Sequence, residues 1–574
     1  MTDSINAEVV SVFPNKVRIA VDDLNSFQIA EQSLRVGSFL KISDNDSVSL
    51  ICIIENFSVE MREKGDTVKR IYMIEAYPLG TLSGTTFKRG GDELAIPPKK
   101  VVPATRAEIA AIYANAVKPE EQCCFSTLMR QPDVKVPVHG DRFFNKHIAI
   151  VGATGSGKSS SVSTILQVAT RAKAGEYTGL NNSHVVIFDI HGEYKTAFPT
   201  AKVLSAEDIV LPYWLLSDGE MEDMFLESGD SNNYNQEALL RSLITHCKEM
   251  ANPQAKKVNY DSPLRYEIEH LQSCLHNLSR ETKDYNDPLT IHYKAGDKDT
   301  FPDDRARLSK YAQGRLEFAA RKTSSINGGI YADGTIDKFV RRIAAKVSNS
   351  RLDFMFGQRA STVTLEDVLR QITGYEKGGE ANVTIIDLSG IPFEVLSITV
   401  SLVTRLLFDF AYHGRRKTGS CETPFLLVYE EAHKYVPRSD LARFKASLNS
   451  IERVAKEGRK YGVSLMISSQ RPSEISETIF SQCSNFLAMR LTNPDDQAYV
   501  KRLLPDTLGN LTAGLPALEQ GEALLIGDAV TMPCAVHVNK CSPEPSSNDI
   551  RYYELWKNPW HAAGLDTAVK EWTP

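Results

Sequence analysis

The 574-residue sequence lacks the features of a membrane or secreted protein. No stretch approaches the roughly 20 consecutive apolar residues that a membrane helix needs. The first residues, MTDSINAEVV, contain no basic region followed by an apolar core, so no secretory signal is predicted. Nine cysteines are scattered along the chain without a C-x-x-C pair. This usage predicts a reducing, cytoplasmic compartment and no structural metal.

The sequence also lacks an excess of positive charge. Its 66 Lys and Arg against 72 Asp and Glu give a net charge of −6, so the composition alone does not predict nucleic-acid binding. Any contact with DNA must come from a local basic surface. Apolar residues at 42% and charged residues at 24% are globular values, and this length predicts about three or four structural units.

Residues 147–166, HIAIVGATGSGKSSSVSTIL, contain a glycine-rich loop between a strand-like run and a helix-like run. The loop fits G-x-x-x-x-G-K-[ST], the P-loop pattern, in which backbone N–H groups face phosphate oxygens at a helix N-terminus. We expect Lys158 to reach the β- and γ-phosphates of ATP, and the hydroxyl of Ser159 to bind Mg²⁺. The expected nucleotide-binding residues are Gly152, Thr154, Gly155, Ser156, Gly157, Lys158, Ser159 and Ser160.

A second motif, FLLVYEEAH, places two carboxylates after an apolar strand, where the Walker B groups of P-loop ATPases lie. Glu430 is expected to hold Mg²⁺ through water, although Asp is commoner at this position. Glu431 is expected to polarise the attacking water as general base. The alternative is an exposed glutamate pair that opens a helix.

Three further candidates come from neighbouring segments. Gln470 ends the buried strand of YGVSLMISSQRPSEIS and is our candidate sensor, which either sets the attacking water or reads the γ-phosphate. Arg459, in RVAKEGRKYG, is either a surface group or an arginine finger that reaches the nucleotide of a neighbouring subunit. Asp189, His191 and Glu193 follow the strand of SHVVIFDIHGEY, where parallel strands face a ligand crevice; a structural role remains equally open.

The remaining segments predict units around this core. Short strand-like runs up to residue 90 indicate a small β-barrel, either for assembly or for binding nucleic acid. Residues 213–375 show helical spacing, for example in DRARLSKYAQGRLEFAARK. Basic groups in this region are either a solvated face or part of a DNA path. They are Lys256, Lys257, Arg305, Arg307, Arg315, Arg321, Lys322, Arg341 and Arg342.

Several motifs in order resemble the HerA family of hexameric DNA translocases, ring ATPases similar to FtsK in their motor core. The motifs are VGATGSGKS, DIHGEY, LPYWLLS, IIDLSGIP, VYEEAHKYVP, EGRKYG and SSQRPSEIS. The resemblance implies that Lys158 and Ser159 bind ATP and Mg²⁺, that Glu431 is the catalytic base, and that Arg459 is a finger acting in trans. The family tends to carry Arg before the His that precedes the P-loop, whereas Lys146 stands there in this chain; Lys lacks the planar fork of Arg, which puts a γ-phosphate role in doubt.

The resemblance implies an α/β fold: a RecA-like P-loop ATPase core with an N-terminal small β-barrel, a helical insertion and a C-terminal strap that reaches a neighbouring subunit. Three tryptophans of the tail, Trp556, Trp560 and Trp572, argue against a free disordered end. The expected division is 1–92 barrel for assembly, 93–140 linker, 141–212 first core part, 213–378 helical insertion, 379–540 second core part and 541–574 strap.

The predicted function is ATP-driven translocation of double-stranded DNA through the channel of a homohexamer. A separate nuclease or effector is expected as partner, in DNA end processing or antiphage defence, because no nuclease motif is present in the chain. One alternative is an ATP-gated ring scaffold that assembles and regulates an effector with little translocation. A conjugative or protein-secretion motor is a further alternative, which the EEAH and SQRP motifs fit less well.

Overall fold

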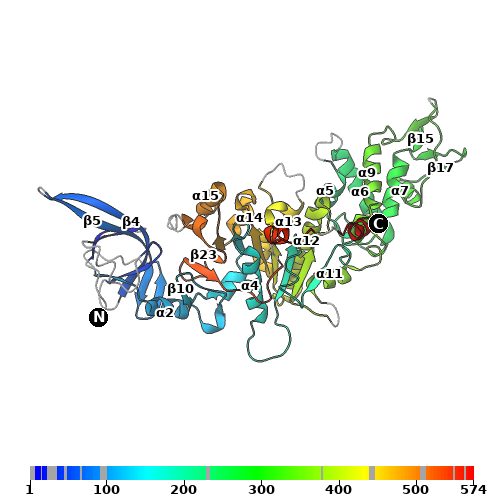
Figure 1. Cartoon of the computed structure of the whole chain (residues 1–574). Helices are drawn as coiled ribbons and strands as arrows, with labels where there is room; N and C mark the ends of the chain where they lie inside the picture. Colours follow the sequence, from blue (N-terminus) through cyan, green and yellow to red (C-terminus); the bar gives the residue numbers. More distant parts are fainter. Residues whose placement is uncertain are drawn as a thin grey trace.

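The structure of the chain is a computed structural model. It describes residues 7–13, 16–21, 35–43, 48–64, 67–90, 100–227, 233–322, 324–375, 379–438, 446–503, 512–546, 550–560 and 564–573. The boundary expected between 92 and 93 falls outside these ranges, and the one expected between 378 and 379 falls at the edge of one. The described units follow one another along the molecule, with an N-terminal sheet at one end, a large sheet in the centre and a helical region at the other end (Figure 1).

An eleven-stranded mixed sheet forms the centre of the molecule. Seven strands from β14 to β22 are parallel, and the remaining four are antiparallel. The carboxyl ends of the parallel strands therefore share one edge. In spatial order the strands are β10 (Gln131–Lys135), β9 (Ser126–Leu128), β24 (Cys534–Val538), β23 (Glu522–Gly527), β22 (Asn485–Met489), β12 (Ile148–Val151), β21 (Val463–Ser469), β20 (Phe425–Tyr429), β13 (His184–Asp189), β19 (Val383–Asp387) and β14 (Lys202–Leu204).

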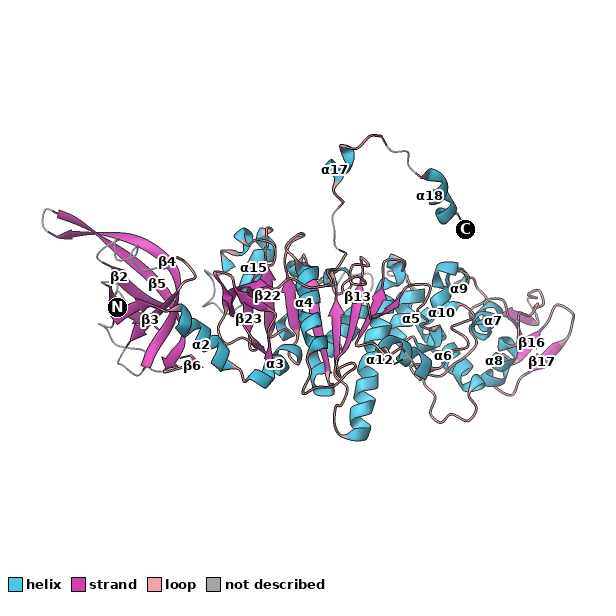
Figure 2. Cartoon of the chain, turned by 60° about the horizontal axis from the view of Figure 1, so that its bottom comes forward, coloured by secondary structure: helices cyan, strands magenta, loops and turns pink. Residues whose placement is uncertain are grey.

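Both faces of this sheet are covered, which explains why its strands are apolar at consecutive positions. Ile148 and Ile150 of β12 pack in one core cluster, with α4 (Lys158–Arg171). Ala149 and Val151 point to the other cluster, with α12 (Phe393–Thr418) and α13 (Ala446–Glu457). Figure 2 shows α4 and α12 running along the strands. The fold thus holds the loop after β12 between two packed layers.

Helix α12 corrects one expectation drawn from the sequence. Its 26 residues are long and apolar enough to cross a membrane, although no such stretch was expected. The helix belongs to the core cluster that contains Val395 and Ile398, and 78% of its most apolar window is buried. It is therefore a core helix of the central unit.

The N-terminal strands, expected as a small β-barrel, form a curled antiparallel half-barrel. The order is β1-β2-β5-β4-β3-β7, with β6 paired to β5, and no ladder joins β1 to β7 among the described residues. The long β4–β5 hairpin projects beyond this sheet (Figure 1). The bounds are β1 (Ala7–Phe13), β2 (Lys16–Val21), β3 (Phe39–Ser43), β4 (Val48–Lys64), β5 (Thr67–Ser83), β6 (Thr86–Arg89) and β7 (Lys100–Pro103).

The stretch 93–140, expected as a linker, contributes to both sheets. Strand β7 pairs with β3 of the half-barrel, whereas β9 and β10 form one edge of the large sheet. Between them lies α2 (Arg106–Ala116), which begins with a capping box formed by Thr105 and Glu108. The short elements η1 (Pro119–Glu121), β8 (Gln122–Cys123), β11 (Val138–His139) and α3 (Gly140–Phe144) complete the stretch.

The described part of the region expected as a helical insertion contains seven α-helices and a four-stranded sheet of order β17-β16-β15-β18. Helices α6 and α7 pack with the central core cluster. The bounds are η2 (Tyr213–Leu215), α5 (Asp218–Phe225), α6 (Asn233–Ala251), α7 (Ile268–Leu278), β15 (Thr282–Asp284), β16 (Thr290–His292), β17 (Lys298–Thr300), α8 (Asp304–Ala312), β18 (Ile326–Gly328), α9 (Asp337–Val347), η3 (Ser350–Leu352), α10 (Asp353–Phe356) and α11 (Leu365–Thr373).

The last part of the chain leaves the body of the molecule. Helices α17 (Tyr552–Trp556) and α18 (Leu565–Trp572) lie on an arm that is separate from the sheets (Figure 2). Their large apolar side chains are exposed, including Trp556 at 75% and Trp572 at 87%. The remaining elements are η4 (Ala432–Lys434), η5 (Gly458–Tyr461), η6 (Pro472–Glu474), α14 (Glu477–Gln482), α15 (Pro494–Leu503) and η8 (Leu515–Ala517).

Candidate nucleotide-binding site

The loop between β12 and α4 has the backbone geometry of a phosphate-binding loop. Gly157 is the N-cap of α4 with φ 97°, a left-handed conformation that a residue with a side chain adopts only with strain. A Cβ atom on Gly152 would lie 2.6 Å from the hydroxyl of Ser156. The loop therefore depends on its glycines, and it presents the N-terminus of a 14-residue helix to the site.

Two polar groups of this loop fit a bound phosphate. The hydroxyl of Ser156 is buried and has no hydrogen-bond partner among the described residues. The ammonium of Lys158 is buried and donates to the carbonyl of Ala153 at 3.4 Å, a long contact. Burial lowers the pKa of Lys158, and the carboxylates of Glu431 and Glu430 oppose that shift. A phosphate would supply acceptors to both groups and offset the cost of the buried charge.

Three adjacent strands bring the predicted catalytic residues together. Strand β21 lies between β12 and β20, so the residues after all three strands meet at one edge of the sheet. The hydroxyl of Thr154 donates to the side-chain oxygen of Gln470. The side-chain amide of Gln470 donates to Glu431, and its backbone N–H does so at 3.3 Å. Gln470 thus joins the P-loop to the second carboxylate of the EEAH motif.

Glu431 is buried and strained, so the alternative of an exposed glutamate pair is wrong. Glu430 and Glu431 are each 4% exposed. Glu431 has φ 45° and ψ 47°, a left-handed conformation that is costly for a residue with a side chain. The imidazole Nδ1 of His433 lies 3.3 Å from its carboxylate and 3.1 Å from the hydroxyl of Ser469. This geometry holds the carboxylate of Glu431 beside the P-loop.

Glu430 lies near two other carboxylates, those of Asp189 and Glu193. Its carboxylate accepts the backbone N–H of Ile190 at 3.0 Å. Burial, together with the neighbouring carboxylates of Asp189 and Glu193, raises the pKa of Glu430 to about 9. A cation such as Mg²⁺ would relieve this repulsion, and Ser159 in the first turn of α4 supplies the hydroxyl that P-loop sites use.

The DIHGEY segment combines structural and site residues. Asp189 is fully buried, and its carboxylate accepts the backbone N–H groups of Gly192 at 2.8 Å, Glu193 at 3.2 Å and Tyr194 at 2.9 Å. It therefore forms the turn after β13. His191 lies outside the cluster of carboxylates, 3.4 Å from the ammonium of Lys434. Glu193 directs its charge toward Lys158 and Glu430.

Arg459 does not join these residues within one chain. It is exposed in η5, which precedes β21, whereas Gln470 follows β21 at the opposite edge of the sheet. The pKa of His147 is lowered mainly by burial and also by the charge of Arg459. Lys146 pairs with Asp528 at 2.5 Å. Neither basic residue contacts the P-loop of its own chain in the hydrogen bonds and ion pairs of the described residues.

Sequence reasoning missed two contacts of the site. The interaction of His433 with Glu431 and Ser469 was not predicted, although His433 belongs to the EEAH motif. Burial lowers the pKa of His433, against the opposing charge of Glu431. The link between Thr154 and Gln470 was also missed, because it depends on which strands are adjacent. Only the strand order reveals it.

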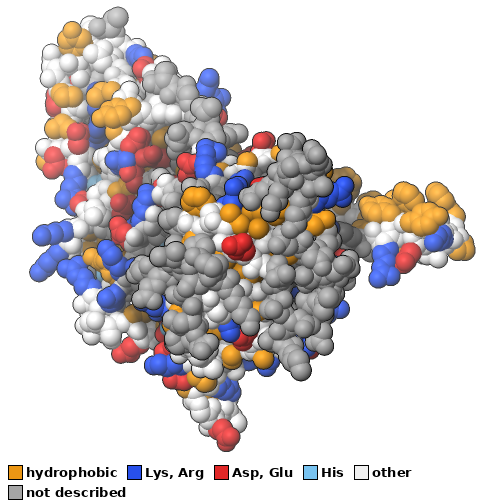
Figure 3. Space-filling model, turned by 90° about the vertical axis from the view of Figure 1, so that its left-hand side faces the viewer, with side chains coloured by type: hydrophobic (Ala, Val, Ile, Leu, Met, Phe, Trp, Pro, Cys, Tyr) orange, Lys and Arg blue, Asp and Glu red, His pale blue; other side chains and the backbone are white. Residues whose placement is uncertain are grey.

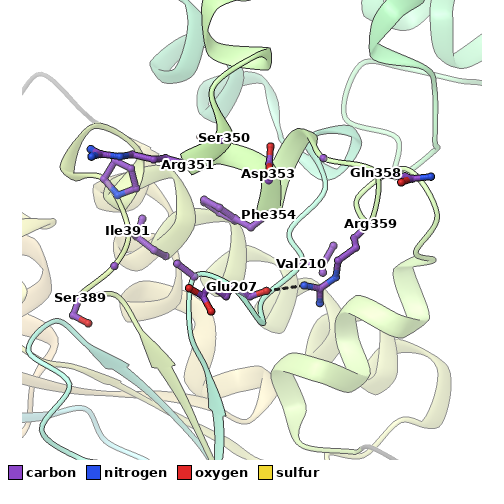
Figure 4. A pocket seen from close by; sticks show the side chains of 14 residues that line it. Glu207, Val210, Ser350, Arg351, Asp353, Phe354, Gln358, Arg359, Ser389 and Ile391 are labelled. Atoms are coloured by element: carbon purple, nitrogen blue, oxygen red, sulfur yellow. Dashed lines mark hydrogen bonds between the residues drawn. The ribbon is translucent and has the colours of Figure 1, made fainter. Parts of the chain in front are cut away.

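A separate pocket of about 890 Å³ lies at the carboxyl ends of β14 and β19. Three strands separate it from the P-loop strand, so it is not the nucleotide site. Arg359 lies at its wall and donates to the backbone carbonyl of Glu207 at 2.6 Å (Figure 4). Ser389, Ile391 and Phe354 contribute further lining. This mixed lining indicates no particular ligand.

Several basic groups of the insertion are engaged within the chain. Arg307 is buried in an ion pair with Glu281 at 3.1 Å, and Arg342 pairs with Glu227 at 3.1 Å. These two do not fit a DNA path. On the face drawn in Figure 3, coloured Lys and Arg side chains are interspersed with Asp and Glu, without one continuous basic surface.

The strand order, the phosphate-binding loop and the buried glutamates define a P-loop-type nucleoside triphosphatase core. A family model described as the central domain of helicase HerA matches residues 123–407. The chain belongs to the HerA helicase family.

Known relatives span most of the chain. It is 24% identical to a probable helicase, MJ1565, of Methanocaldococcus jannaschii, with 96% of this chain and 94% of that protein covered. It is 27% identical to the DNA double-strand break repair helicase HerA of Sulfolobus acidocaldarius, covering 75% of this chain and 72% of that one. Among solved structures, VirB4 of Thermoanaerobacter pseudethanolicus matches with 14% identity and a TM-score of 0.40, over 69% of this chain and 90% of that chain.

Proposed function

We propose that the protein is an ATP-driven double-stranded DNA translocase or helicase that works as a homohexamer. Membership of the HerA helicase family supports action on DNA, and the site supports hydrolysis of ATP with Mg²⁺. The observation that carries the proposal is the chain of contacts from Thr154 through Gln470 to Glu431. It couples the loop that binds phosphate to the group that activates water.

The chain's own residues supply the steps of hydrolysis. The P-loop N–H groups and Lys158 bind and orient the triphosphate, and Glu430 and Ser159 would hold Mg²⁺, which would neutralise phosphate charge. Glu431 accepts a proton from the attacking water. Gln470 orients the Glu431 carboxylate and the water. Arg459 reaches the nucleotide of the next subunit, because it lies at the sheet edge opposite its own P-loop.

The cellular role is proposed at two levels. Relatives named DNA double-strand break repair helicases support a role in DNA repair, within which we propose end processing, whereas antiphage defence gains no support from these names. A separate nuclease or effector remains our proposed partner, because a translocase alone does not cut DNA. The ring-scaffold alternative makes a different prediction, in which an effector protein and not DNA stimulates hydrolysis.

The test is steady-state ATP hydrolysis with and without linear duplex DNA at fixed salt, with the mass of the particle recorded. We expect duplex DNA to raise the rate, and Glu431→Gln to lower it by at least about 100-fold in an intact ring. Glu422→Gln, an exposed position before β20, is the matched control and should keep the rate. Hydrolysis that ignores DNA and responds to a co-purifying protein would favour the scaffold.

A further inference from the structure

Residues 539–546 fasten the start of the C-terminal segment to the P-loop helix. The hydroxyl of Thr164 on α4 donates to the carbonyl of Asn539 at 2.7 Å. One turn further along, the side-chain amide of Gln167 donates to the carbonyl of Pro543 at 2.8 Å. Both donors lie on the helix whose first residue is Lys158, so the segment is attached to the element that binds phosphate.

The same segment ends at the turn that follows β13. The backbone N–H of Ser546 donates to the carbonyl of Glu193 at 2.9 Å, and its hydroxyl does so at 3.3 Å. The hydroxyl of Thr196 donates to the carbonyl of Glu544 at 2.9 Å. The backbone of Glu193 is therefore held from both sides, because its own N–H donates to Asp189 at 3.2 Å.

Among the described residues, no hydrogen bond or ion pair of the Glu193 side chain accounts for this fixed backbone. One carboxylate oxygen is buried and without a hydrogen-bond partner among the described residues. Its charge acts on both Lys158 and Glu430, which places the carboxylate with the phosphate-binding and metal-binding groups. A buried carboxylate oxygen without a donor is costly unless water or a cation completes it.

We propose that Glu193 holds Mg²⁺ through water, and that residues 539–546 position it through the backbone N–H of Ser546. Tight binding of ATP with Mg²⁺ then requires residues 539–546 to be packed against α4 and the turn after β13. Because the exposed helices α17 and α18 come later in the same C-terminal part of the chain, a partner that contacts them can be sensed at the nucleotide. This inference rests on the proposed ATP and Mg²⁺ site and adds a positioning role that the HerA assignment does not supply.

The test compares binding of a fluorescent ATP analogue to the intact protein with Mg²⁺ and with EDTA. The wild-type protein should bind more tightly with Mg²⁺. Glu193→Gln should reduce this gain by roughly tenfold and leave the affinity in EDTA nearly unchanged. Ser546→Pro, which removes the donated N–H, should shift the ratio in the same direction. The double variant should lose little more than Glu193→Gln alone, because both changes act through one carboxylate.

Two controls separate positioning from general damage. Ser546→Ala keeps the backbone N–H, and Glu544→Gln removes one negative charge from the same segment. Both should keep the wild-type ratio. If Ser546→Pro does not fold, Thr196→Val is measured in its place. This substitution removes the hydrogen bond that the exposed hydroxyl of Thr196 donates to the carbonyl of Glu544.

The outcomes distinguish the two proposals. A wild-type protein that binds no nucleotide would overturn the proposed function. A wild-type protein with a normal Mg²⁺ gain that Glu193→Gln and Ser546→Pro both preserve would overturn this inference alone. Fully additive losses in the double variant would also overturn it, since Ser546 would then act elsewhere.

Discussion

At Glu431, the backbone and the side chain are held by different neighbours. Its left-handed conformation is shared only with Lys257 among the described non-glycine residues, and such strain costs about 1–3 kcal/mol. Donors from Gln470 and the ring of His433 surround the carboxylate. The strain is sustained because this position directs the carboxylate along the end of β21 toward the P-loop. The residue type alone would not disclose this constraint.

Replacing Gln470 tests how closely this side chain is coupled to Glu431. Gln470→Glu places a second carboxylate within hydrogen-bond distance of the first, so the pair retains a proton to a higher pH. In this variant, Glu431 becomes available as an unprotonated base only as the pH rises. The rate of ATP hydrolysis by the variant, relative to that of the wild type, should therefore increase between pH 6 and pH 9. Gln470→Ala loses the same hydrogen bonds without adding charge, and its relative rate should stay flat. Identical pH profiles for the two variants would contradict the coupling.

Local patterns predicted much of the candidate site, but contacts between segments required the strand order. The P-loop, the glutamate pair and Gln470 each follow an apolar strand, and the structure brings these segments to one edge. Their catalytic roles stay predictions. The turn-forming role of Asp189 was not predictable, because three backbone N–H groups reach it only after the turn closes.

At the scale of elements, α6 carries a buried lysine that makes the insertion sensitive to pH. The ammonium of Lys248 donates to the carbonyls of Tyr260 at 2.5 Å and Ser262 at 2.7 Å. Burial lowers its pKa to about 8. The unfolded chain binds this proton more tightly than the folded chain, so the penalty is full below about pH 8 and declines as pH rises toward the ordinary lysine pKa.

Lys248→Met should therefore flatten the rise of stability with pH. In thermal unfolding between pH 7.5 and pH 10, the midpoint temperature of the wild type should rise relative to that of the Lys248→Met variant as the pH increases. Lys256→Met, on the exposed loop after α6, is the matched control and should leave the difference constant. A constant difference for Lys248→Met as well would show that the buried group keeps an ordinary pKa.

Helical spacing of apolar residues predicted helices correctly where no pairing with a distant strand competed with helix formation. The stretch ATRAEIAAIYANAV contains α2, and the long apolar stretch before FLLVYEEAH contains α12. The helical spacing of DRARLSKYAQGRLEFAARK is only partly realised, because α8 ends at Ala312 before Gly314, whose φ is 154°. Phe318 then bridges to Tyr293 in the small sheet. Pairing of β9 with β24 was missed for the same reason, since the two strands lie about 400 residues apart.

At the scale of the whole molecule, the C-terminal arm carries an apolar surface that its own chain does not cover. Trp560 is 98% exposed, and Trp556 and Trp572 are nearly as open. We expect these side chains to pack on a neighbouring subunit, as the proposed strap requires. Ending the chain after residue 549 should therefore convert the ring to smaller species in measurements of mass in solution. The unfolding midpoint should change little, and an unchanged ring mass would exclude the strap from assembly.

The position of Arg459 makes each proposed hydrolysis site composite. The length of β21, seven residues, separates Arg459 from Gln470 by about 20 Å, so one chain cannot place both at one phosphate. Glu431→Gln and Arg459→Ala should each be inactive alone. In rings formed from an equal mixture, about one quarter of the interfaces combine an intact Glu431 with an intact Arg459, and hydrolysis should return toward that fraction.

A mixture of Glu431→Gln with Lys158→Ala is the matched control, because both residues act from the same subunit and no interface regains a complete site. If the first mixture stays as inactive as the control, Arg459 does not act across the interface.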